Sequence, residues 1–305
     1  MDKIEKALLK QIADLETIPV GAYNIRENGE GIAKNTTANI DIVTKKNKSG
    51  IDIIVKANTK NESVHIPVIL TNVGFRDLVY NDFYIGENAD VVIIAGCGIH
   101  NSTCETAEHD GIHSFHIEKG ARVRYIEKHY GEGAGVGDRI LNPETKINLC
   151  ENAIMEMESV QIKGVTSTIR KTEANMEKGS RLIISERIMT TENQIAKTIF
   201  DVNLNGKDSS VHVASRSVAE DNSVQEFISN VKGNAKCFGH VECDAIIMGN
   251  AKVISDPKIE ANNIEASLIH EAAIGKIAGE QLIKLMTLGL TEKEAEKQII
   301  NGFLK

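Results

Sequence analysis

The chain of 305 residues has no tryptophan, and aromatic residues make up only 4% of it. Stacking platforms for bases or sugars are therefore poorly supplied. The charge balance is acidic, with 35 Lys and Arg against 43 Asp and Glu, whereas proteins that grip nucleic acid do so mainly with basic side chains. These two deficits argue against a nucleic-acid partner.

Long apolar runs are also missing. Residues 1–20 lack the hydrophobic region of a signal peptide, and no stretch of about 18 apolar residues occurs anywhere. We therefore expect neither export nor a membrane contact. The five cysteines are an odd number, which fits reduced thiols rather than a disulfide framework, so the sequence predicts a cytoplasmic protein.

Familiar catalytic and nucleotide-binding motifs are absent as well. We find no Walker A sequence, no Gly-x-Gly-x-x-Gly opening a helix, no Gly-x-Ser-x-Gly and no His-Glu-x-x-His. Segment 131–137 is rich in glycine but lacks the Lys-Ser/Thr of a phosphate-binding loop. We interpret this segment as a flexible turn.

The chain does contain a long series of short strands rich in Ile and Val, beginning near residue 38. Several share an opening in which a charged or Asn residue precedes a small one, as in Glu87-Asn88-Ala89, Glu118-Lys119-Gly120-Ala121 and Glu151-Asn152-Ala153. Their spacing, at first about 26 to 33 residues, is the signature of a solenoid. A β-sandwich is the rival, but the aromatics to fill its core are scarce. The sequence therefore predicts a mainly β fold, a parallel β-helix.

Helical periodicity is confined to the two ends of the chain. We divide it into an N-terminal helical segment (1–33), a β-helix core (34–273) and a C-terminal helical hairpin (274–305). In the hairpin, Thr291 and Glu294 are spaced as a capping box that opens the last helix. Its apolar residues recur at a spacing of four, at Ala295, Ile299 and Phe303. Such a hairpin either caps the end of the solenoid or docks a partner.

Cysteine and histidine concentrate in three places, and the first is segment 97–116. Within it, Cys97, His100 and Cys104 form a Cys-x-x-His-x-x-x-Cys pattern, and His109, His113 and His116 follow. Thiolates and imidazole at these spacings suit a zinc ion or an iron–sulfur unit. The alternative is a solvated loop with incidental histidines.

The other two places lie near the C-terminus. Cys237 and Cys243 are six residues apart and share one face of a strand unless Gly239 introduces a bulge. The adjacent His270 and Glu271 point to opposite faces of a regular strand and meet at one site only at a strand end or turn. The plain alternatives are a buried cysteine and a surface pair.

The C-terminal third of the chain resembles the SufB/SufD scaffold family of the SUF iron–sulfur cluster assembly machinery. The resemblance is carried by Cys243-Asp244 before an aliphatic strand, by His270-Glu271-Ala272, and by the closing Asn-Gly-Phe at 301–303. It is firm over about residues 205–304. It implies a right-handed parallel β-helix flanked by helices, and an assembly scaffold rather than an enzyme.

The resemblance also implies roles for single residues. Cys243 matches the family's cluster-assembly cysteine, Glu271 matches an essential glutamate, and His270 falls where the SufD branch has its functional histidine. Because His270 and Glu271 stand side by side in one chain, a homodimer is expected in place of a heterodimer. The implied partners are the ABC ATPase SufC, which grips the C-terminal helices in a two-plus-two complex, and apo iron–sulfur proteins that receive the cluster.

Two departures from the family pattern stand out. The chain lacks most of the N-terminal extension of the larger bacterial members, and the 97–116 cluster has no place in them. Both indicate a compact, two-component system of scaffold plus ATPase. Two other functions remain open from the sequence, namely a hydrolase or lyase built on a β-helix and a zinc-binding structural protein.

Overall fold

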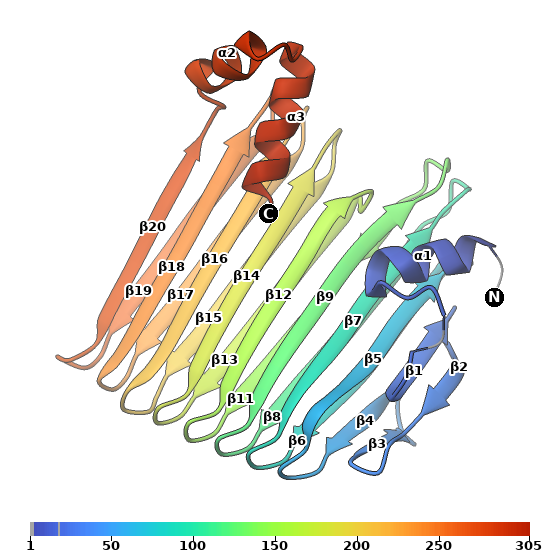
Figure 1. Ribbon diagram of the computed structural model, residues 1–305, viewed down its shortest axis with the longest axis vertical. Helices are drawn as coiled ribbons and strands as arrows, with labels where there is room; N and C mark the ends of the chain where they lie inside the picture. The colour runs from blue at the N-terminus through green and yellow to red at the C-terminus, as the bar shows by residue number, and fades with distance from the viewer. Residues whose placement is uncertain (1–2, 18) are drawn as a thin grey trace.

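The computed structural model describes residues 3–17 and 19–305, and they form a parallel β-solenoid of about eight turns with short helices at both ends (Figure 1). The predicted mainly β class and parallel β-helix are confirmed. Two ten-stranded sheets enclose the lumen. All strand pairings are parallel except β1–β2 and β3–β4, at the N-terminal end.

The two sheets are built from alternate strands of the chain. The first sheet has the order β2 (Glu30–Asn35), β1 (Ala22–Glu27), β5 (Lys60–Leu70), β7 (Asp90–His100), β9 (Arg122–Glu132), β12 (Ile154–Lys163), β14 (Arg181–Thr190), β16 (Ser209–Ala219), β18 (Cys237–Ile247) and β20 (Ser267–Gly275). The second has the order β19 (Lys252–Ala261), β17 (Val224–Gly233), β15 (Ile195–Leu204), β13 (Ser167–Met176), β10 (Arg139–Leu141), β8 (Ala107–Ile117), β6 (Phe75–Ile85), β4 (Gly50–Val55) and β3 (Ile40–Thr44). Strand β11 (Glu144–Leu149) pairs with β8 and β13.

The repeated sequence motif forms one corner of each coil. Asn88 and Asn152 have φ values of 55° and 58°, and Gly120 has 65°, a left-handed conformation that Asn and Gly tolerate best. The small residue that follows turns into the lumen, and Ala89 and Ala121 are fully buried. The motif therefore repeats because each corner needs the same backbone bend and the same small side chain.

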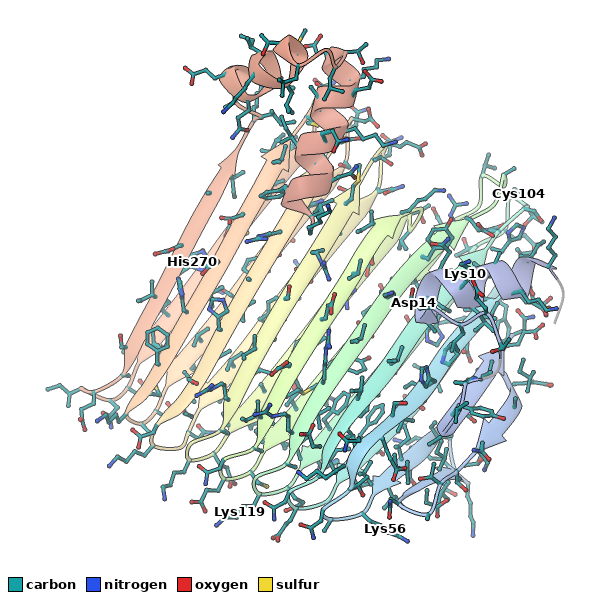
Figure 2. All side chains as sticks on the ribbon, viewed as in Figure 1. Lys10, Asp14, Lys56, Cys104, Lys119 and His270 are labelled. Carbon is teal, nitrogen blue, oxygen red and sulfur yellow. The ribbon has the colours of Figure 1, made fainter. Side chains whose placement is uncertain are left out.

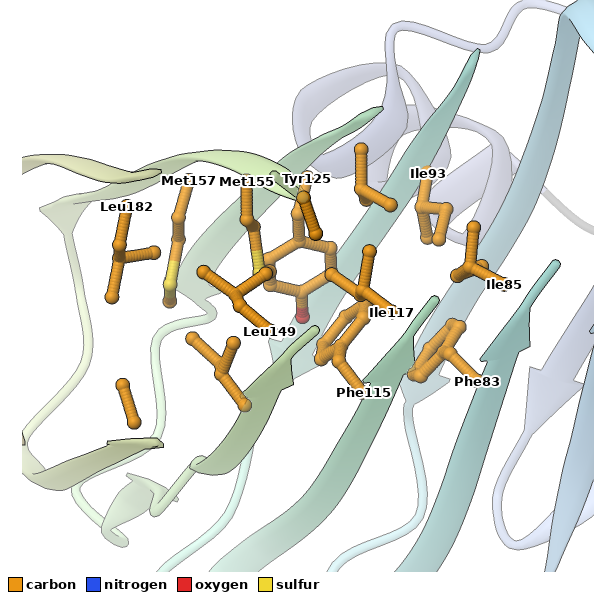
Figure 3. Packing of buried hydrophobic residues seen from close by; sticks show 14 of the residues in the cluster. Phe83, Ile85, Ile93, Phe115, Ile117, Tyr125, Leu149, Met155, Met157 and Leu182 are labelled. Carbon is orange, nitrogen blue, oxygen red and sulfur yellow. The ribbon is translucent and has the colours of Figure 1, made fainter. Parts of the chain in front are cut away.

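The few aromatic residues are used inside the lumen. Phe83 and Phe115 stack with ring centroids 4.2 Å apart, and Tyr125 meets Phe115 edge-on at 5.0 Å. Figure 3 shows these rings beside Met155 and Met157. This apolar part of the lumen is the main hydrophobic core.

Helix α1 (Lys3–Ala13) covers the outer face of the first sheet over β7 (Figure 1). Its Leu8 and Ile12 are fully buried. A Cβ at Gly96 would lie 2.3 Å from the carbonyl oxygen of Ile12, so the close approach of the helix requires glycine there. Strand β1 lies within the predicted helical segment 1–33, with Ala22 in the lumenal core and Ile25 packed under helix α1 beside Leu8 and Ile12. No helix in the described ranges is long and apolar enough to cross a membrane.

The C-terminal hairpin consists of α2 (Gly279–Thr287) and α3 (Glu292–Phe303). The capping box of Thr291 and Glu294 is confirmed. Helix α3 buries Ala295 and Ile300, and Ile300 joins Leu304 against Val218 of β16, so the buried stripe drifts from the predicted spacing of four. The hairpin packs beside the ends of β14, β16 and β18 and does not cover the last coil, where most residues of β19 and β20 are exposed.

Candidate lumenal thiol and imidazole site

Part of the lumen is polar. One row of inward-facing positions runs in unbroken register across the first sheet through Ala95, Glu127, Ser159, Glu186, Ser215, Cys243 and Ala272. Its polar members are at most 4% exposed. Buried carboxylates are rare unless they are paired. Burying the polar side chains of this row therefore lowers the stability of the fold unless partners compensate for it.

Cys243 lies on β18 at the C-terminal end of this row. Its thiol borders a cavity of about 10 Å³ that Glu186 and Ser215 also line, a space for about one water molecule. Burial raises the pKa of Cys243 to about 11, and the nearby Ser255 hydroxyl offsets only part of this effect. The group is therefore a protonated thiol at neutral pH, and a metal ion that binds it must displace a proton.

His270 belongs to β20 in the last coil, one strand from Cys243. It pairs with the inward-facing Val241, so its half-buried ring also faces the lumen. Neither Nδ1 nor Nε2 has a hydrogen-bond partner among the described residues. Burial, and then the proximity of His240, lowers its pKa. A neutral imidazole whose two nitrogens have no hydrogen-bond partner is able to coordinate a metal ion.

Glu271 faces the other way, as alternation along a regular strand requires. It pairs with the outward-facing Glu242, its side chain is 69% exposed, and its Oε2 lies 3.6 Å from Nε2 of His240. The structure thus places Cys243 and His270 on the lumenal side of the sheet and Glu271 on the outer side. A single chain does not bring all three together.

Cys237 and Cys243 share the lumenal face of β18, and both are buried. Gly239 introduces no bulge, because the register with both neighbouring strands is continuous through it. Cys237 lies near the apolar residues of the main core. It has the surroundings of a small hydrophobe.

The pattern at Cys97, His100 and Cys104 is dispersed. Cys97 faces the lumen from β7, whereas His100 faces away from it, with its Nδ1 3.3 Å from Oε1 of Glu132. Cys104 is exposed in a loop at the other end of the solenoid from His270 (Figure 2). The Gly-rich segment 131–137 packs its backbone against this loop, with Gly135 N donating to the carbonyl of Asn101 at 3.0 Å, rather than forming a flexible turn.

Cys97 instead meets two lumenal histidines, His109 of β8 and His129 of β9. Burial alone would raise the pKa of the Cys97 thiol, but the charge and hydrogen bond of His109, with a further contribution from His129, lower it to about 7. Burial would lower the pKa of His109, but Cys97 and Asp77 raise it to about 10. His109 Nδ1 lies 3.0 Å from Asp77 Oδ2. The two opposite pKa shifts favour a charged thiolate beside a charged imidazolium in this part of the lumen.

Arg170 of β13 joins this pair to the polar row. It is 1% exposed, it pairs with Glu127, its Nη2 lies 3.1 Å from Nδ1 of His129, and its Nε lies 3.5 Å from Oε1 of Glu186. Ser215 donates to Oε2 of Glu186 at 2.8 Å. Buried polar contacts therefore extend from Cys97 to the strand beside Cys243.

Sequence reasoning missed Glu127, His129, Arg170 and Glu186. A signal was present, because each stands at an alternating, inward position of its strand, in line with apolar residues such as Val123, Met176 and Leu182. Recognising it requires the register between coils, which the sequence pattern alone did not supply.

Fold and site together define a β-solenoid that holds thiol and imidazole donors inside its lumen, a donor set suited to sulfur chemistry and to borderline or soft metal ions. A family model agrees. The SufBD core domain of SUF-system FeS cluster assembly matches residues 81–303. The chain therefore belongs to the SufB/SufD family, and this membership supports a role in iron–sulfur cluster assembly.

Relatives found by sequence comparison carry the same family name. An iron–sulfur cluster assembly SufBD family protein of Methanocaldococcus jannaschii is 29% identical over 243 residues, which are 79% of this chain and 76% of the relative. A SufBD family protein of Methanothermobacter thermautotrophicus is 29% identical over 72% of this chain and 53% of its own length. The iron–sulfur cluster assembly protein SufB of Bacillus subtilis is 27% identical over 72% of this chain. This chain spans 47% of that SufB.

Proposed function

We propose that this chain is a scaffold, not an enzyme, on which an iron–sulfur cluster is assembled at Cys243 and His270. The observation that carries the proposal is the lumenal imidazole of His270, whose two nitrogens have no partner among the described residues, one strand from a buried thiol. The 97–116 pattern, whose three predicted ligands are dispersed, is the weaker candidate for the cluster.

The raised pKa of Cys243 suits a scaffold that must release its product. A thiolate is the soft donor that iron–sulfur clusters require, but at neutral pH the proton competes for the sulfur because the thiol pKa is about 11. Binding therefore releases a proton, and loss of the cluster is favoured when the thiol is protonated again. One thiolate with one imidazole also holds a cluster less firmly than four cysteines would.

The test is anaerobic reconstitution with iron and sulfide, counted per chain. Cys243→Ser should lose the cluster and His270→Ala should weaken it. Cys237→Ser is the matched control, because this thiol is also buried on the same face of β18. A Cys243→Ser protein that keeps wild-type iron and sulfide contradicts the proposal. If Cys97→Ser or Cys104→Ser abolishes the cluster instead, the site belongs to the 97–116 segment.

A homodimer is the second part of the proposal. β19 and β20 end the two sheets and have no further strand partner in the described part of the chain, and unpaired strand edges readily pair with another chain. Apolar side chains, among them Ile254, Ile259 and Ile269, are 41–50% exposed on these strands. Contact through this end would bring two Cys243 regions together and would let Glu271 of a second copy approach the lumenal ligands.

Light scattering tests the dimer. Ile269→Lys should give monomers, whereas Ile195→Lys, at a 52% exposed site on the interior strand β15, should not. A wild-type chain that is monomeric at micromolar concentration and still binds a full cluster contradicts this part.

Docking of a SufC-like ABC ATPase is the third part, with ATP hydrolysis in the partner. Helix α2 has no buried residue, and Ile283 and Met286 are exposed on it, whereas α3 is held on the solenoid. The apolar side chains of α2 are therefore free to contact a partner. Ile283→Asp with Met286→Asp should abolish pull-down of the ATPase, and Lys284→Ala on the same helix should not. Pull-down that survives the double substitution contradicts the docking role.

A further inference from the structure

The outer face of the last coils carries a cluster of metal-ligand side chains that the lumenal site does not use. His212 of β16 pairs in register with His240 of β18, and their ring centroids are 5.3 Å apart. One donor atom from each of His212, His240 and Glu242 lies within 4.8 Å of the other two. Glu271 adds a second carboxylate, 3.6 Å from His240 Nε2.

The charges of this cluster favour a cation. Within the described ranges, neither Glu242 nor Glu271 forms an ion pair with Lys or Arg, and both carboxylates lie against histidines. Nε2 of His240 is shielded from solvent and has no hydrogen-bond partner in the described structure. Two carboxylates without a basic neighbour and an unpartnered imidazole nitrogen leave a place for a positive ion.

We propose that His212, His240 and Glu242 bind one divalent first-row transition-metal ion on the outer face of the solenoid, with Glu271 beside the other ring nitrogen of His240. Two imidazoles and carboxylates without a thiolate suit Fe²⁺, Zn²⁺ or Co²⁺ rather than Cu⁺, Mg²⁺ or Ca²⁺. Donors around one such ion lie at ~2 Å from it. His212 is 42% exposed and Glu242 31%, so both side chains are free to make the small rotations that close the site.

The proposed ion and the Cys243 thiol lie on opposite faces of the sheet, although their ligand residues are adjacent in the chain. Glu242 faces outward and Cys243, its neighbour, faces the lumen. If cluster assembly at Cys243 is correct, the ion held outside is ferrous iron on its way to the cluster, and this physiological identity rests on the proposed function. Metal binding at His212, His240 and Glu242 does not rest on it.

The experiment is a titration of full-length, cluster-free Cys243→Ser protein, which lacks the lumenal thiol ligand, with Co²⁺ alone, followed by calorimetry and by the visible spectrum. This protein should bind one ion per chain, and its spectrum should lack thiolate-to-cobalt charge transfer. Because loss of a mere supporting residue typically costs 10–100-fold in metal affinity, His212→Asn and Glu242→Gln should each weaken binding by about 100-fold. His116→Asn is the matched control, since His116 also faces outward but stacks on Tyr84.

The outcomes separate this inference from the proposed function. Unchanged Co²⁺ affinity in folded His212→Asn and Glu242→Gln proteins overturns it, as does a spectrum dominated by thiolate bands. Circular dichroism establishes that both variants are folded. A wild-type protein that binds Co²⁺ through these residues but assembles no cluster supports the metal site and refutes the scaffold. Slower cluster assembly by His212→Asn at limiting ferrous iron, relieved by excess iron, supports the supply role.

Discussion

Cys97 and Cys243 have similar positions on lumenal strands, but the pKa values of their thiols differ. Both are thiols at inward positions of the first sheet, at 6% and 2% exposure. The pKa of Cys97 is lowered to about 7 and that of Cys243 is raised to about 11. Burial acts in the same direction on both. The difference comes from His109 and His129, whose charges and hydrogen bonds lower the pKa of Cys97, whereas no histidine among the described residues shifts the pKa of Cys243 in this way.

The comparison shows how one lumen can hold two kinds of thiol. At neutral pH about half of the first is thiolate, the nucleophilic form, and the second is a thiol that ionises only when a metal ion replaces its proton. Arg170 lies between the two environments and pairs with carboxylates on both sides. Four predictions test this contrast.

Removing Arg170 should have the largest effect on the molecule. Arg170→Met leaves Glu127 and Glu186 without their shared cation inside the lumen. Breaking a buried pair in this way costs about 3–5 kcal/mol in the free energy of unfolding. Denaturant unfolding measures it. The exposed Arg122→Met on β9 is the control and should change stability by less than about 0.5 kcal/mol. Equal stability of the two variants would show that the lumen is hydrated enough to screen these charges.

The second prediction concerns the cause of the low pKa of Cys97. Without the His109 charge, burial dominates, so His109→Gln should raise the Cys97 pKa from about 7 to above its ordinary value of 9.0. The ultraviolet absorption of the thiolate, followed against pH, reports the change. His113→Gln is the control, because burial lowers the pKa of His113 to about 4 and leaves it uncharged at neutral pH. An unchanged titration in His109→Gln would refute the ion pair.

The third prediction is a pH dependence. The Cys97 pKa is lower in the folded chain, about 7, than its ordinary 9.0. Its contribution to stability is therefore present above pH 9 and is lost as the pH falls through 7. Cys97→Ser should destabilise the protein by about 1–2 kcal/mol more at pH 8 than at pH 6. Cys237→Ser should show no such growth, because burial raises the pKa of that thiol. A Cys97→Ser deficit independent of pH would mean that only packing is lost.

The smallest effect is expected on the Cys243 side. Ser215→Ala removes one of the two hydroxyls that donate to Glu186, the other being Thr198. The loss of this hydrogen bond should cost only about 1 kcal/mol in the free energy of unfolding, because the hydroxyl of Thr198 still donates to the carboxylate. Thermal unfolding measures it, with Ser217→Ala on the same face as the control. The Cys97 titration should not move, and a shift would show that the two thiol environments are coupled.

Much of the fold was predictable from the sequence, because it depends on local features that repeat. The corner motifs at Asn88 and Gly120 mark coils through backbone conformation, and Thr291 with Glu294 marks a helix start through a local hydrogen-bond pair. The family resemblance at Cys243 and His270 likewise rests on short contiguous segments.

The site was less predictable, because its contacts join residues of different coils. Cys97 meets His129 through a register between β7 and β9 that spacing along the chain does not reveal. Conversely, His100 is close to Cys97 in sequence but lies on the other face of β7. A metal-ligand spacing such as Cys-x-x-His-x-x-x-Cys brings its side chains together only when the segment forms a loop. In an extended strand the same residues lie far apart or on opposite faces.

The unbroken register of the polar row limits where the chain can change length. From β9 to β20, each lumenal residue of the row stands directly against its counterpart in the next coil. Inserting one residue within any of these strands would turn every later side chain of that strand to the opposite face. Additions at corners, or of a complete coil, leave the alignment intact. Insertions of whole coils, or insertions at corners, are therefore compatible with this fold. Within a strand, only substitutions preserve the alignment of the row.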